Sequence, residues 1–238
     1  MALDFENKVV LITGASGNVG AAAARRFAGG GARLALVARS TADFEPLAAE
    51  LGGETLLLAA DLTQPDGVNR MVEQVEARFG QIDVLAHTVG GFFLGKPVYE
   101  MAVDELERAW KLNTLPVFLV AGRVAHHMLE HSVQGHIVVV LAKSAAAGSA
   151  RLGPYTASKA AAQRLVESLA AEVRDAGIHV NGVSPRTIDT PENRADMPKA
   201  DTSKWVTVEQ MADAIAFLAS PASAGLYGAN LEIFGRAG

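Results

Sequence analysis

The sequence predicts an α/β fold: a doubly wound parallel sheet covered by helices on both faces. Three observations support this prediction. Short apolar runs recur along the chain, longer stretches of helical period separate them, and a glycine-rich turn follows the first run. Continuous apolar runs are typical of parallel strands that are buried on both faces. The length of 238 residues fits one large domain, and no linker or repeat interrupts it, so we expect a single domain over residues 1–238.

The strands are expected at residues 8–13, 33–38, 55–60, 82–86, 136–141, 179–183 and 230–234. Helices are expected from the glycine turn to about residue 29 and over 66–79, 100–130, 156–175 and 208–220. Pro116 is expected to kink the long helix over residues 100–130. Residues 185–205 lack clear periodicity and are rich in charge and proline, which predicts a loop that covers a substrate.

Composition and charge exclude several classes of function. The net charge of -5 argues against a nucleic-acid or anionic-membrane partner. The absence of cysteine excludes disulfides, thiolate catalysis and cysteine-ligated zinc. The amino-terminal residues MALDFENK lack the apolar core of a signal peptide, and no apolar run is long enough to span a bilayer. We therefore expect a cytoplasmic protein that acts on a small molecule.

The glycine turn predicts a dinucleotide-binding site. It reads Thr13-Gly-Ala-Ser-Gly-Asn-Val-Gly20, lies after the first expected strand and opens the first helix. Glycines allow a tight turn and a close approach of pyrophosphate, which then faces the helix amino terminus. The alternative is a plain strand-to-helix turn without a ligand. The position of the glycine turn after the first strand favours a Rossmann-type dinucleotide site. The expected cofactor contacts are Gly14, Ser16, Gly17, Asn18, Val19 and Gly20.

The end of the second strand indicates which dinucleotide is bound. Ala38 lies where NAD-binding folds usually have an acid that holds the ribose hydroxyls, and Arg39 follows it. A guanidinium can pair with a 2′-phosphate, so we predict NADP(H); a solvated arginine is the alternative. Asp61, followed by Leu62, could accept a hydrogen bond from the adenine amine or could cap its own turn.

A phenol and an amine lie one helical turn apart in Tyr155-Thr-Ala-Ser-Lys159, a spacing that suits proton transfer. With the glycine turn, Asp61, Asn113 and the segment Pro185-Arg-Thr-Ile-Asp-Thr190, this motif resembles the short-chain dehydrogenase/reductase family over essentially the whole chain.

The resemblance implies a role for each matching residue. Tyr155 would be the acid/base. Lys159 would lower the pKa of Tyr155 and hold the nicotinamide ribose, and Asn113 would anchor a water that links Lys159 to solvent. His87, Gly90, Pro185, Ile188 and Thr190 would contact the cofactor. For His87, a satisfied polar residue at a strand end is an equal alternative. The family also tends to form homodimers or homotetramers through its long helices.

One departure from the family pattern bears on the substrate. The usual catalytic serine lies thirteen residues before the tyrosine, which is Ala142 here, and Ser144 lies two residues later. The residues 187–205 resemble those of dihydropteridine reductases, a subgroup with alanine at that place. We therefore expect an NADPH-dependent reductase of a conjugated acceptor. The alternatives are a carbonyl or 3-oxoacyl reductase that uses Ser144, and a dinucleotide-binding sensor without turnover.

A group of histidines was also considered as a metal site. His126, His127 and His131 lie close together on one expected helix, but no third ligand is evident beside the spaced pair His127 and His131. We therefore expect no metal.

Overall fold

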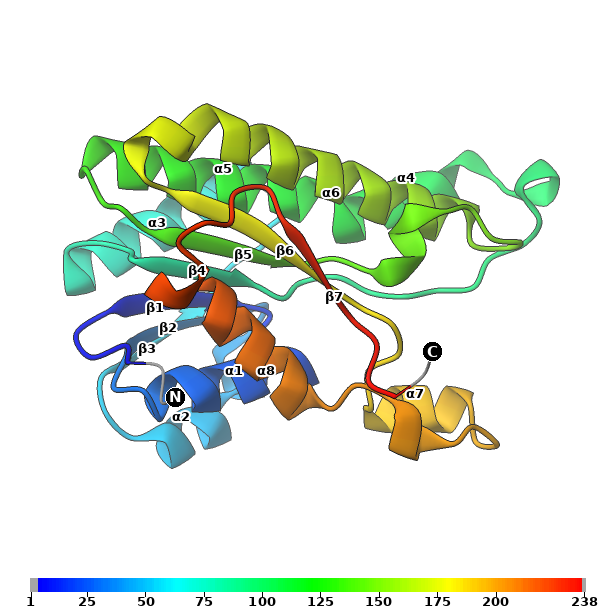
Figure 1. Cartoon of the computed structure of the whole chain (residues 1–238), viewed down its shortest axis with the longest axis horizontal. Helices are drawn as coiled ribbons and strands as arrows, with labels where there is room; N and C mark the ends of the chain where they lie inside the picture. Colours follow the sequence, from blue (N-terminus) through cyan, green and yellow to red (C-terminus); the bar gives the residue numbers. More distant parts are fainter. Residues whose placement is uncertain (1–3, 237–238) are drawn as a thin grey trace.

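The computed structural model describes residues 4–236 and contains one seven-stranded parallel sheet, which confirms the predicted fold class (Figure 1). The strand order is β3-β2-β1-β4-β5-β6-β7. The strands are β1 (Val9–Thr13), β2 (Arg33–Ala38), β3 (Thr55–Ala59), β4 (Val84–His87), β5 (His136–Val140), β6 (His179–Pro185) and β7 (Asn230–Ile233). The chain order reverses between β1 and β4, which creates a crevice at the carboxyl ends of these strands.

Helices cover both faces of the sheet (Figure 1). One face carries α3 (Pro65–Phe79), α4 (Val103–Asn113), α5 (Leu115–Glu130) and α6 (Gly153–Val173). The other carries α1 (Asn18–Ala28), α2 (Glu45–Leu51) and α8 (Val208–Leu218). Successive strand residues alternate between the two layers: Val9 and Leu11 join one apolar core, whereas Val10 and Ile12 join the other. Within residues 4–236, no helix has both the length and the apolar character needed to cross a membrane.

The single long helix predicted over residues 100–130 is wrong. The structure has a 3-10 turn at Val98–Glu100, then α4, and then α5 as a separate helix after Thr114. Proline lacks the backbone N–H that would bond the carbonyl four residues earlier, so Pro116 is accommodated only in the first turn of a new helix. The break places Asn113 at the end of α4.

The sequence analysis also missed two short helices. Helix α2 has seven residues, and α7 (Pro191–Asp196), within the segment predicted to be a loop, has six. Helices this short show less than two turns of apolar period, so the pattern cannot reveal them. The start of α7 is fixed locally, because the Thr190 side chain accepts a hydrogen bond from the Asn193 backbone N–H and Pro191 follows the cap.

Candidate active site

The residues predicted to form the site come together at the carboxyl edge of the sheet. Each lies in a strand end, in a loop after a strand, or on the helix that such a loop enters. The loops after β1 to β6 contribute, in order, residues 14–20, Arg39, 61–62, His87 with Gly90, Ser144 and 188–190. Asn113 and the Tyr155–Lys159 pair reach the same edge from α4 and α6. In an open parallel sheet this crevice is the position at which ligands bind.

The glycine turn has the geometry that a pyrophosphate requires. Gly14 has a φ of +72°, in the left-handed region that glycine adopts without strain. A Cβ on Gly20 would overlap the Gly14 carbonyl, so this position allows α1 to pack closely on the turn. The residue that caps α1 is Gly17, which offers no side-chain acceptor, and the first turn has no acid. The backbone N–H groups at this helix amino terminus therefore suit an anion.

Arg39 lies directly after β2, and Asp61 lies two residues after the end of β3. Arg39 is exposed, and among the side chains that the structure describes none pairs with its guanidinium. Asp61 caps its own turn, because its Oδ1 accepts hydrogen bonds from the Thr63 N–H (2.9 Å) and hydroxyl (2.7 Å). These hydrogen bonds lower the pKa of Asp61. The turn-capping alternative for Asp61 is therefore observed directly.

Residues 185–206 are held by their own contacts and by the glycine turn. Ile188 forms an isolated parallel bridge with Val206, and the Asn193 side-chain amide donates to the Ile188 carbonyl at 2.8 Å. Arg194 forms a bidentate ion pair with Asp189. The Asn18 amide donates to Glu192 of α7 at 2.9 Å. Residues 188–192, including Thr190, thus lie beside the turn that is suited to the pyrophosphate.

Tyr155 lies in the first turn of α6, which begins at Gly153 with Pro154 inside its first turn. Its side chain is buried, and this burial raises the pKa of the phenol, while a side-chain hydrogen bond with Ser144 lowers it. Ser144 lies on the short 3-10 turn Lys143–Ala146, and it is exposed. The turn that carries Ser144 packs against α6, the helix of Tyr155, although the position thirteen residues before Tyr155 is alanine.

Lys159 is buried beside the tyrosine, and its ammonium donates to the Val140 carbonyl at 3.0 Å. Burial lowers the pKa of Lys159 to about 8. A Cβ on Gly90 would come within 2.7 Å of Lys159 Nζ, so a side chain there would displace the ammonium. The sequence analysis expected Lys159 to lower the pKa of Tyr155. In the structure the pKa of Tyr155 is raised instead, because desolvation of the phenol dominates.

Asn113 ties two parts of the site together. Its side-chain Oδ1 accepts from the Gly91 N–H at 2.9 Å, and its Nδ2 donates to the Gly91 carbonyl and to the Ser158 hydroxyl. Ser158 in turn donates to the Tyr155 carbonyl at 2.8 Å. The sequence analysis missed Ser158. Its position inside the Tyr155–Lys159 turn was the available signal, but its partner on α4 is visible only after folding.

His87 is a fully buried histidine at the end of β4. Its Nδ1 lies 2.9 Å from the Thr13 hydroxyl, and its Nε2 has no hydrogen-bond partner among the described residues. Burial, together with the positive charge of Lys159, lowers the pKa of His87 to about 3, so the ring is neutral at pH 7. Within the protein His87 is thus a half-satisfied strand-end residue that lies close to the proton-transfer pair.

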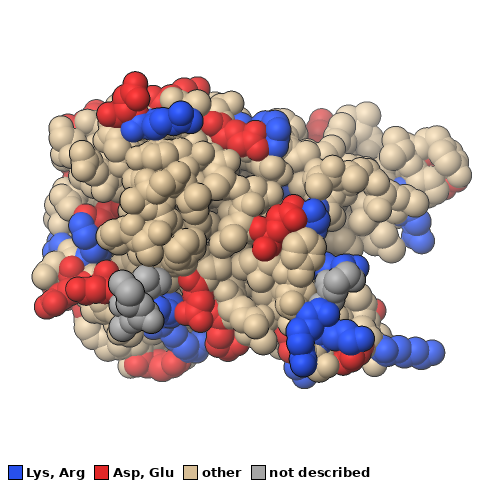
Figure 2. Space-filling model, in the orientation of Figure 1, with Lys and Arg blue, Asp and Glu red and all other residues tan. Residues whose placement is uncertain are grey.

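The site opens between two projections of the surface. One consists of residues 91–102 with residues 146–152, and the other is the α7 segment (Figure 1). Figure 2 shows the surface hollowed between them, with lysine and arginine gathered on the α7 projection and mainly uncharged atoms on the other. The two projections therefore differ in the character of their surfaces.

The pair His127 and His131, at the end of α5, acquires a third candidate ligand that the sequence did not indicate. Glu76 of α3 lies 3.6 Å from His127 Nδ1 and 3.2 Å from His131 Nε2, so these three groups are close enough to surround an ion. However, His127 Nε2 accepts a hydrogen bond from the Ile82 N–H. A neutral ring that accepts at Nε2 has its proton on Nδ1, and a protonated nitrogen cannot ligate a metal. The cluster is better described as a carboxylate between two imidazoles.

Comparison with known proteins now identifies the family. Residues 8–201 match the family described as short chain dehydrogenase. The chain belongs to this family. It is 32% identical to cis-4-hydroxycyclohexanecarboxylate dehydrogenase of Sinomonas cyclohexanicum, covering 97% of this chain and 96% of the relative. It is 30% identical to 3-oxoacyl-[acyl-carrier-protein] reductase FabG of Escherichia coli K12, covering 98% of each. A short-chain type dehydrogenase/reductase from Mycobacterium marinum superposes with a TM-score of 0.92 at 31% identity, covering 98% and 96% of the two chains.

As a short-chain dehydrogenase/reductase, the protein is an NAD(P)H-dependent oxidoreductase that acts on a small molecule. Membership in a family of named dehydrogenases and reductases disfavours a sensor without turnover. The enzyme also has the two prerequisites of such chemistry: a turn suited to a dinucleotide and a buried tyrosine–lysine pair.

Proposed function

We propose that this short-chain dehydrogenase/reductase interconverts a carbonyl and an alcohol with NADP(H), using Tyr155 as proton donor and Ser144 as the second hydroxyl. The observation that carries the proposal is the position of Ser144 on a 3-10 turn that packs against α6, where its side chain lowers the pKa of Tyr155. It brings two hydroxyl groups together at the open end of the crevice, where both can donate to one carbonyl oxygen. Ser144 would thus supply the donor that Ala142 cannot.

The protein groups act on the oxygen and on the proton. Ser144 would hold the carbonyl oxygen, and Tyr155 would transfer its proton to that oxygen as negative charge develops. Lys159, with its cationic ammonium about 3 Å from the Val140 carbonyl, would stabilise the phenolate that remains. When bound, the nicotinamide supplies the hydride. The glycine turn, Gly90 and the backbone around Ile188 and Thr190 would hold the cofactor in place.

The proposed preference for NADP(H) rests on Arg39. The side chain is exposed, follows Ala38 rather than an acid, and has no partner among the described side chains. It is therefore available to a 2′-phosphate without first breaking an ion pair. For NADH, the site offers no carboxylate at residue 38 to hold two free ribose hydroxyls.

The names of the relatives support a hydroxyl-bearing or oxo substrate. They include dehydrogenases of glucose and D-threitol, of two six-membered carbocyclic acids, and a 3-oxoacyl reductase. The contact between Ser144 and Tyr155 removes the reason that Ala142 gave for preferring a conjugated acceptor. The similarity of residues 187–205 to dihydropteridine reductases still makes a quinonoid dihydropterin the comparison substrate.

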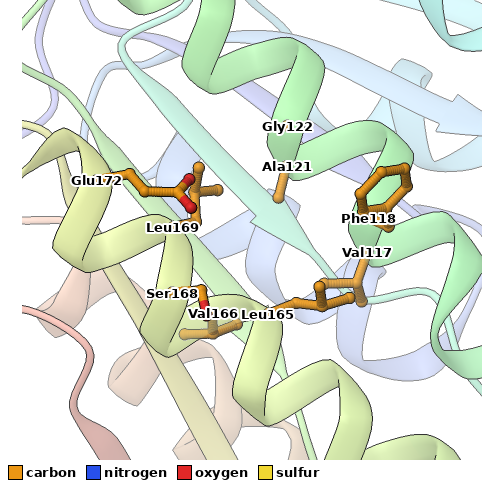
Figure 3. Close-up of a pocket in the computed structure, with 9 residues that line it drawn as sticks. All are labelled: Val117, Phe118, Ala121, Gly122, Leu165, Val166, Ser168, Leu169 and Glu172. Carbon is orange, nitrogen blue, oxygen red and sulfur yellow. The ribbon is translucent and has the colours of Figure 1, made fainter.

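We also propose that two copies pair through α5 and α6. A groove of about 180 Å³ runs between these helices, where Ala121, Gly122 and Ser168 leave room (Figure 3). Phe118, on the rim of the same groove, is 60% exposed. A face that carries both a groove and a protruding ring suits a two-fold interface, because the ring of each copy can fill the groove of the other. Phe118→Glu should then yield a monomer in analytical ultracentrifugation, whereas Leu129→Glu, at another exposed apolar position of α5, should not.

The test of the proposed function is NADPH oxidation at 340 nm with a panel of ketones, a 3-oxoacyl thioester and quinonoid dihydropterin. Ser144→Ala should lower kcat for the ketones by about a hundredfold, since one hydrogen-bond donor to a developing oxyanion contributes about that much. Turnover of dihydropterin alone, unaffected by Ser144→Ala, would overturn the carbonyl proposal in favour of the conjugated acceptor.

A further inference from the structure

The segment between β4 and α4 exposes an unusual amount of apolar surface beside the site. Phe92 is 59% exposed, Leu94 56%, Val98 69% and Tyr99 86%. Burial alternates along residues 91–95, with Phe92 and Leu94 exposed and Phe93 half-buried. Exposed apolar surface next to a reactive group is typical of a ligand-binding wall, and the exposed ring that contacts Tyr155 is that of Phe92.

Phe92 and Phe93 both contact the ring of Tyr155. The Phe92 ring centroid lies 5.0 Å from that of Tyr155 with the planes at 78°, and the Phe93 centroid lies 6.3 Å away at 71°. Each pair is edge-to-face, the arrangement that aromatic rings prefer. Phe92 thus combines an exposed surface with a direct contact to the Tyr155 ring, so a ligand that reaches Tyr155 can contact Phe92.

Two sets of backbone hydrogen bonds fix the three residues that lie between Gly91 and Gly95. At the first end, Asn113 accepts from the Gly91 N–H and donates to its carbonyl. At the second, the Gly95 N–H donates to the Arg151 carbonyl at 2.9 Å, and Arg151 Nε donates to the Gly95 carbonyl at 3.0 Å. The two exposed apolar side chains between them are thus presented on a fixed backbone, which lowers the entropic cost of binding a ligand.

Arg151 adopts an uncommon conformation to make this contact. Its φ is +63°, a left-handed value that costs energy in a residue with a side chain. Gly153, two residues later, lies so close to Val98 that a Cβ would come within 2.8 Å of its methyl group. The Arg151 contact and this close approach both hold the apolar segment against the start of α6, next to Tyr155.

We propose that Phe92 is a specificity-determining residue that seats a flat apolar ring of the substrate next to the reacting carbonyl, and that Arg151 is a positioning residue for it. This inference rests on the proposed function and names the class of substrate: an aryl or similarly planar ketone, or the matching secondary alcohol. The occupant is a small molecule, because the exposed ring directly abuts the tyrosine that is to transfer the proton.

Three ketones distinguish a preference for a planar ring from a preference for any apolar ring. Acetophenone has a planar ring, cyclohexyl methyl ketone has an apolar ring that is not planar, and butan-2-one has neither. Phe92→Ala should raise KM for acetophenone about tenfold, raise KM for cyclohexyl methyl ketone less, and leave KM for butan-2-one within about twofold. Phe92→Leu should restore the cyclohexyl substrate but only partly restore acetophenone. Equal losses for all three ketones would overturn the specificity role.

Two further variants test the position of Phe92. Tyr99→Ala removes an even more exposed ring of the same segment, one without a ring contact to Tyr155, and should leave all three KM values unchanged. Arg151→Gly keeps the backbone conformation accessible but removes the Nε–H donor to Gly95. It should raise KM for acetophenone more than for butan-2-one, with kcat for butan-2-one retained. A uniform fall in kcat for every ketone would mean that Arg151 is only structural.

Equilibrium binding separates this inference from the proposed function. Acetophenone is titrated into the NADPH-saturated protein and followed by saturation-transfer NMR, which requires no turnover. Binding that weakens about tenfold in Phe92→Ala supports the ring site even if no ketone is reduced, in which case the proposed function alone fails. Binding that is the same in Phe92→Ala and wild type overturns the ring site, whatever the activity.

Discussion

The two proposed sides of the crevice differ in what holds their backbone. The cofactor side lies after β1 and β2, and the substrate side consists of residues 91–102, 144–155 and 185–205. Around the glycine turn the constraint is local: Gly14 has a positive φ, and the Gly17 N–H donates to the Gly14 carbonyl. On the substrate side, bonds join residues far apart in sequence, such as Gly91 to Asn113 and Gly95 to Arg151.

The comparison teaches which functions a short motif can encode. A pyrophosphate can be bound by a single turn and helix terminus, because the backbone N–H groups that it accepts from belong to consecutive residues. Recognition of a substrate requires side chains from several loops, which only the folded sheet brings together. Substitutions should therefore divide into those that affect one side of the crevice and those that affect both.

The largest effect is expected from Tyr155→Phe. Removing the hydroxyl leaves no proton donor of suitable position, so kcat should fall about a thousandfold. The Kd for NADPH, measured by fluorescence, should stay within about twofold, because the phenyl ring is retained and the glycine turn is untouched. If Kd rises in parallel with the loss of kcat, the two sides of the crevice are not separable in this way.

The next effect concerns His87, which lies between the two sides. Its pKa is about 3 in the folded protein against 6.5 in the unfolded chain, so below pH 6.5 the unfolded state binds more protons. Its contribution is therefore fully present above pH 6.5 and decreases as the pH falls toward 3. At pH 4.5 the expected loss from this group is about 3 kcal/mol of unfolding free energy.

Urea denaturation at pH 7 and pH 4.5 measures this contribution. His87→Asn, which keeps a polar group for Thr13, should lose less stability between the two pH values than wild type does. His126→Asn, at an exposed histidine of α5, is the matched control and should follow the wild-type curve. Identical pH dependence in all three proteins would show that His87 does not titrate in a buried environment.

A smaller effect, confined to the cofactor side, is expected from Arg39→Ala. Loss of the guanidinium should raise KM for NADPH about tenfold and leave KM for NADH and for the ketone nearly unchanged. Steady-state kinetics with each cofactor provide the measurement. The reverse variant, Ala38→Asp, should shift the preference toward NADH. If Arg39→Ala weakens both cofactors equally, the 2′-phosphate is not what Arg39 binds.

The smallest effect is expected from Ala142→Ser. If Ser144 supplies the second hydroxyl, as proposed, another serine two residues earlier adds no needed donor, and kcat should change by less than about twofold. The double variant Ala142→Ser with Ser144→Ala distinguishes the positions. Recovery of activity in the double variant would mean that a serine at residue 142 can also reach the substrate. No recovery would mean that only residue 144 can place the second hydroxyl at the carbonyl oxygen in this protein.

Sequence reasoning predicted the local features and missed those that depend on packing. The strands, the glycine turn and the Tyr155–Lys159 spacing follow from consecutive residues, and the structure contains them. The orientation of Ser144, the partner of Asn113 and the approach of Glu76 to His127 do not, because each depends on how one helix or loop packs on another. The raised pKa of Tyr155 was missed for a related reason. Burial of the phenol, which raises its pKa, depends on the packing around Tyr155 and cannot be seen in the spacing of the motif.

The hydrogen bonds that hold residues 91–95 have a consequence for how such an enzyme can diverge. They involve the backbone of two glycines, Gly91 and Gly95, and not the side chains of the three residues between them. Those three side chains can therefore be exchanged without loss of the contacts that hold the loop. Substitutions at Phe92, Phe93 and Leu94 can therefore change the range of substrates, while the sheet, the proton-transfer pair and the glycine turn keep the same structure.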